Sequence, residues 1–289
     1  MKKLVLATGL SGLVGTRIAE ILADSFEFQD LSLATGIDIS DKSRLEKAFE
    51  NSSADVVLHM AAKTDVDGCE DDKLLGEEGA AWLVNVVGTA NVIEAAKNTG
   101  KRIIYISTDF VFDGTRQIYT EDDEPNPVSW YGFTKFQGEE ILKKADIDST
   151  ILRIAYPYRN KNNIRSDFVH RIIEVMGSSG RCLAVTDHIF TPTFIDDIAA
   201  ALELFLVRNL PGIYHVVGSS SLSTYDAVKL IADIYSLKGV ITPITREKYF
   251  KNRAFRPFKL ALSNDKIRKL SLSMNTFLQG LKIIKKQDL

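Results

Sequence analysis

Short apolar segments alternate with amphipathic segments along the first half of the chain. Residues 3–8 (KLVLAT) form an apolar run that stops at Gly9, and from Val14 onward apolar residues recur at helical spacing. The segment 55–62 (DVVLHMAA) is apolar throughout, which is typical of a strand covered on both faces of a sheet. We therefore expect an α/β fold with a doubly wound parallel sheet, a Rossmann fold. Further strands are predicted at 26–33, 102–108 and 149–155.

The helices predicted between and after these strands carry end signals. A polar residue that can cap the first turn precedes two of them, and a glycine closes another. The predicted helices are one starting after Ser40 or Asp41, a long one over 80–100 closed by Gly100, one over 131–145, and one starting after Ser223 or Thr224.

The alternation becomes irregular from about residue 156. We expect 1–155 plus about 185–220 to form the dinucleotide-binding domain. The remainder, 156–184 plus about 221–289, is expected to form a smaller, discontinuous substrate-binding lobe over the sheet.

The turn between the first strand and the first helix reads TGLSGLVG, with Gly9, Gly12 and Gly15 in the spacing G-x-x-G-x-x-G. In such a turn one glycine permits the tight bend, one lets backbone approach a pyrophosphate, and one lets the helix pack close to the strand. The helix N-terminus then offers free amides to the phosphates. The loop, which also holds Leu10, Ser11, Leu13 and Val14, therefore predicts dinucleotide binding, although three glycines can also serve a purely structural turn.

The choice between NAD and NADP is left open by the sequence. An acid at the end of the second strand would bind the ribose hydroxyls and favour NAD, and Asp30 is a candidate. Asp38 is expected nearer the adenine. There is no arginine in this region to bind a 2′-phosphate.

Further along the chain, three residues form a candidate catalytic set. Thr108 ends the fourth strand, and that end of a parallel sheet borders the ligand crevice. Tyr131 and Lys135 are four apart and share a helix face. A lysine ammonium beside a phenol is expected to lower the tyrosine pKa, and such a tyrosine can protonate an alkoxide as hydride reaches a carbonyl carbon. Thr108 would hold the carbonyl oxygen.

Composition narrows the class of protein. The chain has 289 residues and a net charge of −2, which does not favour a nucleic-acid or membrane-surface binder, and no apolar run reaches 18 residues. The first 15 residues resemble the start of a signal peptide, but no cleavage site follows them, so a signal peptide is not expected. Cys69 and Cys182 are expected to be free thiols in a reducing cytoplasm. The four histidines show no metal-ligand spacing, so no metal is expected.

Several blocks resemble the extended short-chain dehydrogenase/reductase family, and within it the dTDP-4-dehydrorhamnose reductase branch. They include TGLSGLVG, AAKTDVDGCE, STDFVFDG, YGFTKFQGEEIL, FTPTFIDDIA and GIYHVVG, in the order of that branch and over nearly the whole chain. The resemblance implies a reductase of a nucleotide-linked 4-keto-deoxysugar that uses NADPH or NADH.

Individual roles follow from the same resemblance. It makes Thr108, Tyr131 and Lys135 the catalytic triad and Gly9–Gly15 the phosphate loop. It places Asp38 and Ile39 at the adenine, and Ala61, Ala62 and Lys63 beside the cofactor. Thr64, Val66 and Phe110 would face the sugar, and Tyr156 would lie near nicotinamide and sugar.

Arg159, Arg253 and Arg256 are our own candidates for a diphosphate, because a guanidinium fork suits that group.

The departures from the branch lie mostly on the substrate side. They are a longer segment between Glu70 and Asn85, YPYR after the fifth strand, His188 in TDHIF, and Thr224. Two alternatives therefore stay open: a nucleotide-sugar 4-epimerase with bound NAD, and a non-catalytic subunit resembling the methionine adenosyltransferase β-subunit. A dehydratase is disfavoured, because Asp109 is followed by Phe110 and not by a second acid. The oligomeric state is not fixed, and a homodimer is one expectation.

Overall fold

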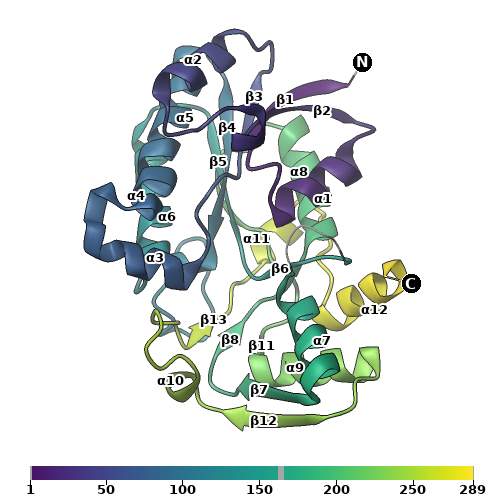
Figure 1. Cartoon of the computed structure of the whole chain (residues 1–289). Helices are drawn as coiled ribbons and strands as arrows, with labels where there is room; N and C mark the ends of the chain where they lie inside the picture. The colour runs from purple at the N-terminus through teal and green to yellow at the C-terminus, as the bar shows by residue number, and fades with distance from the viewer. Residues whose placement is uncertain (1, 162–165, 289) are drawn as a thin grey trace.

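Six parallel strands form the central sheet of the computed structural model, which describes residues 2–161 and 166–288 (Figure 1). Their order, β10-β5-β4-β3-β1-β2, reverses direction of winding between β1 and β3, so the sheet is doubly wound as predicted. The strands are β1 (Lys3–Thr8), β2 (Phe26–Leu31), β3 (Val56–His59), β4 (Arg102–Thr108), β5 (Ser149–Ile154) and β10 (Gly212–His215).

Helices cover both faces of this sheet, because alternate side chains along each strand point to opposite faces. Val5 and Ala7 of β1 pack with the apolar residues of α1 (Leu13–Leu22) and α8 (Ile195–Val207). Leu6, between them, packs on the other side, where α2 (Lys42–Glu50), α5 (Thr89–Asn98) and α6 (Trp130–Lys144) lie. The predicted α/β class is confirmed.

The helix ends follow the sequence signals. The interior of the longest helix, however, departs from a regular α-helix. Asp41 caps α2 by accepting from the Arg44 amide, and Ser223 caps α9 (Thr224–Tyr235). The helix predicted over 80–100 is continuous but starts as α4 (Ala80–Trp82) and widens into a π-helical segment, η3 (Leu83–Gly88), before α5. This wider segment places Asn85 in the interior.

The smaller lobe lies beyond the carboxyl ends of the strands and is built from short pieces (Figure 1). Strands β8 (Ile189–Phe190), β11 (Leu222–Ser223) and β13 (Lys259–Leu260) form one small sheet, β7 (Arg181–Val185) pairs with β12 (Val240–Ile244), and β6 (Pro157–Tyr158) pairs with β9 (Thr193–Phe194). Its helices are α7 (Phe168–Ser179), α9, α10 (Arg246–Tyr249) and α12 (Phe277–Gln287).

Two segments, β8 and α11, show that the chain crosses more than once between the large sheet and the lobe. Strand β8 pairs with β11 and β13 of the lobe, whereas Ile267 of α11 (Asp265–Arg268) packs in the core beside α8. The predicted division into two parts stays a prediction at this level of detail. The remaining elements are η1 (Leu33–Thr35), α3 (Val66–Asp72), η2 (Lys73–Glu78) and η4 (Asp109–Val111).

Strand β10 is one edge of the sheet, and two of its outward backbone groups are bound by side chains. The Lys266 Nζ donates to the Ile213 carbonyl oxygen at 2.7 Å, and the His215 amide donates to Glu121 Oε1 at 2.8 Å. In the part of the chain that the structure describes, no helix has the length and apolar character needed to cross a membrane.

Candidate active site

The glycine loop joins β1 to α1 with the geometry that its spacing predicts. Gly9 has φ +74°, and a Cβ there would lie 2.6 Å from the Ala61 amide nitrogen. A Cβ on Gly15 would overlap the carbonyl oxygen of Gly9 and approach Leu10 Cα at 2.6 Å. Gly12, the N-cap of α1, would meet only the Gly9 oxygen, at 3.3 Å. Side chains at Gly9 and Gly15 would therefore clash with the protein backbone, whereas the space next to Gly12 is nearly free.

The loop after β3 is held against this turn by Thr8. Its Oγ1 accepts from the Met60 and Ala61 amides, at 3.2 and 3.1 Å, and bonds His59 Nδ1 at 2.7 Å. His59 is completely buried, and burial lowers its pKa to about 3, so the ring is neutral. This arrangement positions Ala61, Ala62 and Lys63 beside the glycine loop.

Asn85 connects that loop to the helix that carries Tyr131 and Lys135. Its Oδ1 accepts from the Lys63 amide at 2.8 Å, and its Nδ2 donates to the Lys63 carbonyl at 3.1 Å and to Thr134 Oγ1 at 3.0 Å. Asn85 was not among the site residues predicted from the sequence. The signal was present, since a buried asparagine inside an apolar helix requires partners.

The three candidate catalytic residues come together where β4 ends. Thr108 caps η4, and the Ser129 hydroxyl caps α6 by accepting from Gly132. The Tyr131 phenol lies within hydrogen-bonding reach of the Thr108 side chain. Lys135 is one turn further along α6, with its Nζ 4.1 Å from the centre of the Tyr105 ring.

The predicted effect of Lys135 on Tyr131 is wrong. Burial raises the pKa of Tyr131, and the nearby Asp109 raises it further, while the hydrogen bond with Thr108 only partly offsets this. Burial also lowers the pKa of Lys135, to about 7. The phenol is therefore protonated at neutral pH, and the lysine is close to its titration midpoint.

Asp109 is a further acid in the site and was not among the site residues predicted from the sequence, where only the Phe110 that follows it counted against a dehydratase. It is 1% exposed, its Oδ1 accepts from Thr108 Oγ1 at 3.0 Å, and burial raises its pKa to about 7. The carboxyl is thus partly protonated at neutral pH and can donate as well as accept.

Aromatic side chains continue the site toward the lobe. The Phe110 ring packs against Tyr131, with centroids 5.6 Å apart, and against Tyr156 at 6.4 Å. Tyr156 has φ +41° and bonds His188 Nε2 at 3.3 Å, while His188 Nδ1 bonds Thr224 Oγ1 at 3.3 Å. Three of the positions at which the chain departs from its resemblance are therefore linked to one another.

The three arginines lie in different surroundings. Arg256 pairs with Asp67 at 2.5 Å, and Arg253 is exposed and lines a pocket of about 410 Å³ together with Asp67. Arg159 is buried and turned toward α1, where it donates to Thr16 Oγ1 at 3.1 Å and to Glu20 at 2.7 Å. The structure does not bring Arg159 together with the other two.

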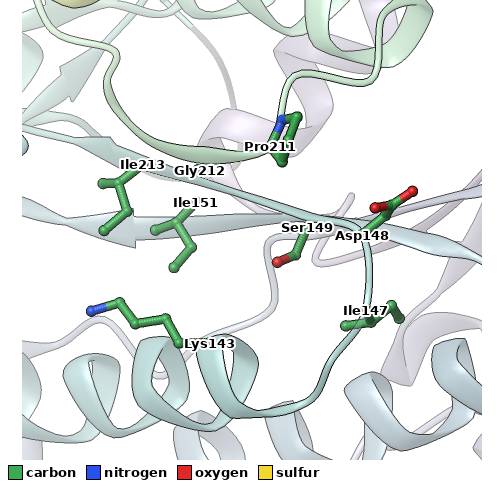
Figure 2. A pocket seen from close by; sticks show the side chains of 8 residues that line it. All are labelled: Lys143, Ile147, Asp148, Ser149, Ile151, Pro211, Gly212 and Ile213. Atoms are coloured by element: carbon green, nitrogen blue, oxygen red, sulfur yellow. The ribbon is translucent and has the colours of Figure 1, made fainter.

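A second pocket, of about 250 Å³, lies away from these residues (Figure 2). Figure 2 shows Lys143 of α6 beneath Ile151 of β5 and Ile213 of β10. Ser149 and Gly212, the first residues of those strands, line it, so it opens at the amino ends of the sheet. Ligands of doubly wound sheets bind at the carboxyl ends, and we do not assign this pocket to the active site.

Known proteins share this architecture along the whole chain. The family described as RmlD substrate binding domain matches residues 1–288. This chain belongs to that family.

Proteins similar to this chain include two that are named dTDP-4-dehydrorhamnose reductase. The chain is 30% identical to the spore coat polysaccharide biosynthesis protein SpsK of Bacillus subtilis, over 96% of this chain and 95% of that one. It is 32% identical to the dTDP-4-dehydrorhamnose reductase of Aggregatibacter actinomycetemcomitans, over 79% and 78%. The crystal structure of the Bacillus anthracis dTDP-4-dehydrorhamnose reductase in complex with NADP superposes with a TM-score of 0.90 at 27% identity, covering 99% and 100% of the two chains.

The residues of this RmlD-family chain fit a nicotinamide dinucleotide. Lys135 Nζ is buried, and among the described residues no group accepts a hydrogen bond from it, which suits the hydroxyls of a ribose. The N-terminus of α1 has glycine as its cap and therefore no side chain bound to its amides.

Cys69 and Cys182 are free, buried thiols. Within residues 2–161 and 166–288 no cluster of histidine, cysteine or acidic side chains could hold a metal ion.

Proposed function

We propose that this protein is an NAD(P)H-dependent reductase of a nucleotide-linked 4-keto-deoxysugar, similar to dTDP-4-dehydrorhamnose reductase. The observation that carries the proposal is the meeting of Thr108, Tyr131 and Lys135 beside an open glycine loop. Loop, phenol and ammonium occupy the carboxyl edge of one sheet, where a dinucleotide and a sugar can be held side by side.

The cofactor side is assigned to the two loops described above. The segment Gly9–Gly15 with the α1 N-terminus would hold the diphosphate, and Lys135 the nicotinamide ribose. Ile39, which is buried, would lie beneath the adenine, and Asp38, which is exposed, would lie at its rim. Ala61, Ala62 and Lys63 would line the remaining wall.

Tyr131 acts as the proton donor in this mechanism. When bound, a reduced nicotinamide would supply the hydride for the C4 carbonyl carbon of the sugar. Tyr131 gives its phenolic proton to the oxygen, which becomes the C4 hydroxyl, and Thr108 orients that oxygen. The raised pKa of Tyr131 keeps the proton in place at neutral pH, so the resting residue is in the form that a reduction needs.

The sugar nucleotide is assigned to the side that faces the lobe. Phe110 and Tyr156 would pack on the sugar, with Thr64 and Val66 at its edge. Arg253 and Arg256 are candidates for the diphosphate, whereas the contacts of Arg159 with α1 favour a role in joining the lobe to the dinucleotide domain. The homodimer and the cytoplasmic location stay predictions.

A spectrophotometric assay tests the function. Oxidation of NADPH and NADH is followed at 340 nm, a standard wavelength for reduced nicotinamides, with a panel of nucleotide-linked 4-keto-deoxysugars. We expect turnover with at least one 4-keto sugar, and a loss of about 10²–10⁴-fold in Tyr131→Phe with unchanged cofactor affinity. Absence of turnover together with tightly copurified nicotinamide would favour the epimerase, and cofactor binding without any turnover would favour the regulatory subunit.

A further inference from the structure

Glu139 is a buried carboxylate that lies behind the catalytic residues and has no part in the mechanism above. It is completely buried in α6, and its Oε1 accepts from Ser107 Oγ at 2.5 Å and from Arg153 Nε at 3.0 Å. Its Oε2 accepts from the second guanidinium arm of Arg153 at 2.6 Å. Both carboxylate oxygens are thus bound by donors from the sheet.

These donors are neighbours across three strands. Ser107 of β4 is in register with Arg153 of β5, and Arg153 is in register with His215 of β10. Arg153 reaches His215 Nε2 at 3.5 Å, and the Phe112 ring lies 5.0 Å from its guanidinium carbon. The row Ser107–Arg153–His215 therefore forms a rigid polar platform, and Glu139 docks α6 on it.

The same carboxylate is tied to two of the catalytic residues. Ser107 directly precedes Thr108, and Lys135 lies one helical turn before Glu139 on the same face of α6. Lys135 Nζ finds no acceptor among the described residues, so a negative charge one turn away matters for its ionisation.

We propose that Glu139 is a positioning residue for Lys135: docked on Ser107 and Arg153, its carboxylate fixes α6 against β4 and keeps the Lys135 ammonium charged where a nicotinamide ribose would bind. The proposal rests on the dinucleotide site of the proposed function but not on the identity of the sugar. Consistent with it, Glu139 opposes the lowering of the Lys135 pKa by burial.

The ionisable groups that directly face Lys135 do not titrate in the same range. His59 and Tyr105 face it from β3 and β4, and Tyr131 from its own helix. The pKa of His59 is about 3, and burial raises the pKa of both tyrosines. Asp109 has a pKa of about 7, but it faces Thr108 and Tyr131 and is the same in all the variants below.

The test is the pH dependence of NADPH binding, measured by fluorescence titration between pH 6 and 9 without any sugar. Wild-type affinity should fall as Lys135 loses its proton. In Glu139→Gln the midpoint of that fall should move to lower pH by about one unit, which makes binding about tenfold weaker at pH 8. Glu139→Asp retains the charge and should restore the midpoint. Glu140→Gln is the matched control, because Glu140 is the next residue on α6 and pairs with Lys143 at the surface.

Glu139→Gln leaves the guanidinium of Arg153 without its counter-ion and can unfold the protein. The double variant Glu139→Gln/Arg153→Met removes both charges, and because loss of the guanidinium offsets part of the effect, it should show a smaller acid shift than Glu139→Gln. A folded neutral variant with the wild-type midpoint overturns the proposal. If no neutral replacement at 139 folds, Glu139 serves stability alone, which also overturns it. Because NADPH binding is measured alone, failure on the sugar panel does not bear on this result.

Discussion

The Lys135 ammonium lies 4.1 Å from the centre of the Tyr105 ring, and the Tyr105 hydroxyl donates to the Lys135 carbonyl oxygen at 3.3 Å. One tyrosine of β4 therefore contacts both the side chain and the backbone of a candidate catalytic residue on α6. His59 also stacks on the Tyr105 ring, with the ring centres 5.4 Å apart.

The Tyr105 contact predicts a difference between two replacements. Tyr105→Leu removes the ring beneath the ammonium and should weaken NADPH binding about 3–30-fold, the range expected for a desolvated cation–π contact. Tyr105→Phe keeps the ring and should bind NADPH nearly as well as wild type. Fluorescence titration measures both, with circular dichroism as the check on folding. Equal affinity in the leucine variant would mean that the ring does not position Lys135.

The glycine loop predicts that binding and stability can be separated. Gly12→Val should abolish NADPH binding with little change in melting temperature, because only the Gly9 oxygen lies near its Cβ. Gly15→Val should lower the melting temperature markedly, since its Cβ meets the backbone of Gly9 and Leu10. Thermal melts and calorimetric titration test the pair. Retained binding in Gly12→Val would place the dinucleotide elsewhere.

Asp30 is expected to set the preference between the two cofactors. It is the penultimate residue of β2, and its carboxylate accepts from Ser32 Oγ at 2.8 Å. A negative charge there accepts from a ribose 2′-hydroxyl and repels a 2′-phosphate. Asp30→Asn should raise the affinity for NADPH relative to NADH by about tenfold. Glu27→Gln, exposed on the same strand, is the control. A ratio that is equal in both variants would contradict the assignment.

His170 predicts a pH-dependent stability. Burial lowers its pKa, but the hydrogen bonds and charges of Asp167 and Asp288 outweigh this, and the pKa is raised above 6.5. The charged ring therefore stabilises the folded chain fully below pH 6.5, and this contribution is lost as pH rises through the folded pKa. The wild-type advantage in melting temperature over His170→Gln should shrink between pH 5.5 and 8.5. A melting-temperature difference that grows with pH would show that the charged ring does not stabilise the folded chain.

The parts of the fold and site that the sequence predicts are those written in local patterns. The strand Lys3–Thr8, the glycine turn and the Tyr131/Lys135 spacing each lie within a few consecutive residues. The partners of Glu139 could not be predicted, because Ser107, Arg153 and His215 meet only through the register of three strands.

The direction of the Tyr131 pKa was mispredicted for a related reason. Helical spacing shows that Lys135 is near, but the cost of burying the phenol depends on the whole surrounding core, and here it dominates. The π-helical turn that brings Asn85 inside is likewise absent from the apolar pattern, which reads as one regular helix.

The edge strand β10 has a consequence for how copies of this protein can associate. A free strand edge invites a second chain to continue the sheet, the route by which many proteins aggregate. Here a newcomer would have to displace the Lys266 ammonium from Ile213 and the Glu121 carboxylate from His215. Strand addition at this border is thereby disfavoured, which makes β10 a poor place for uncontrolled pairing between copies of the chain.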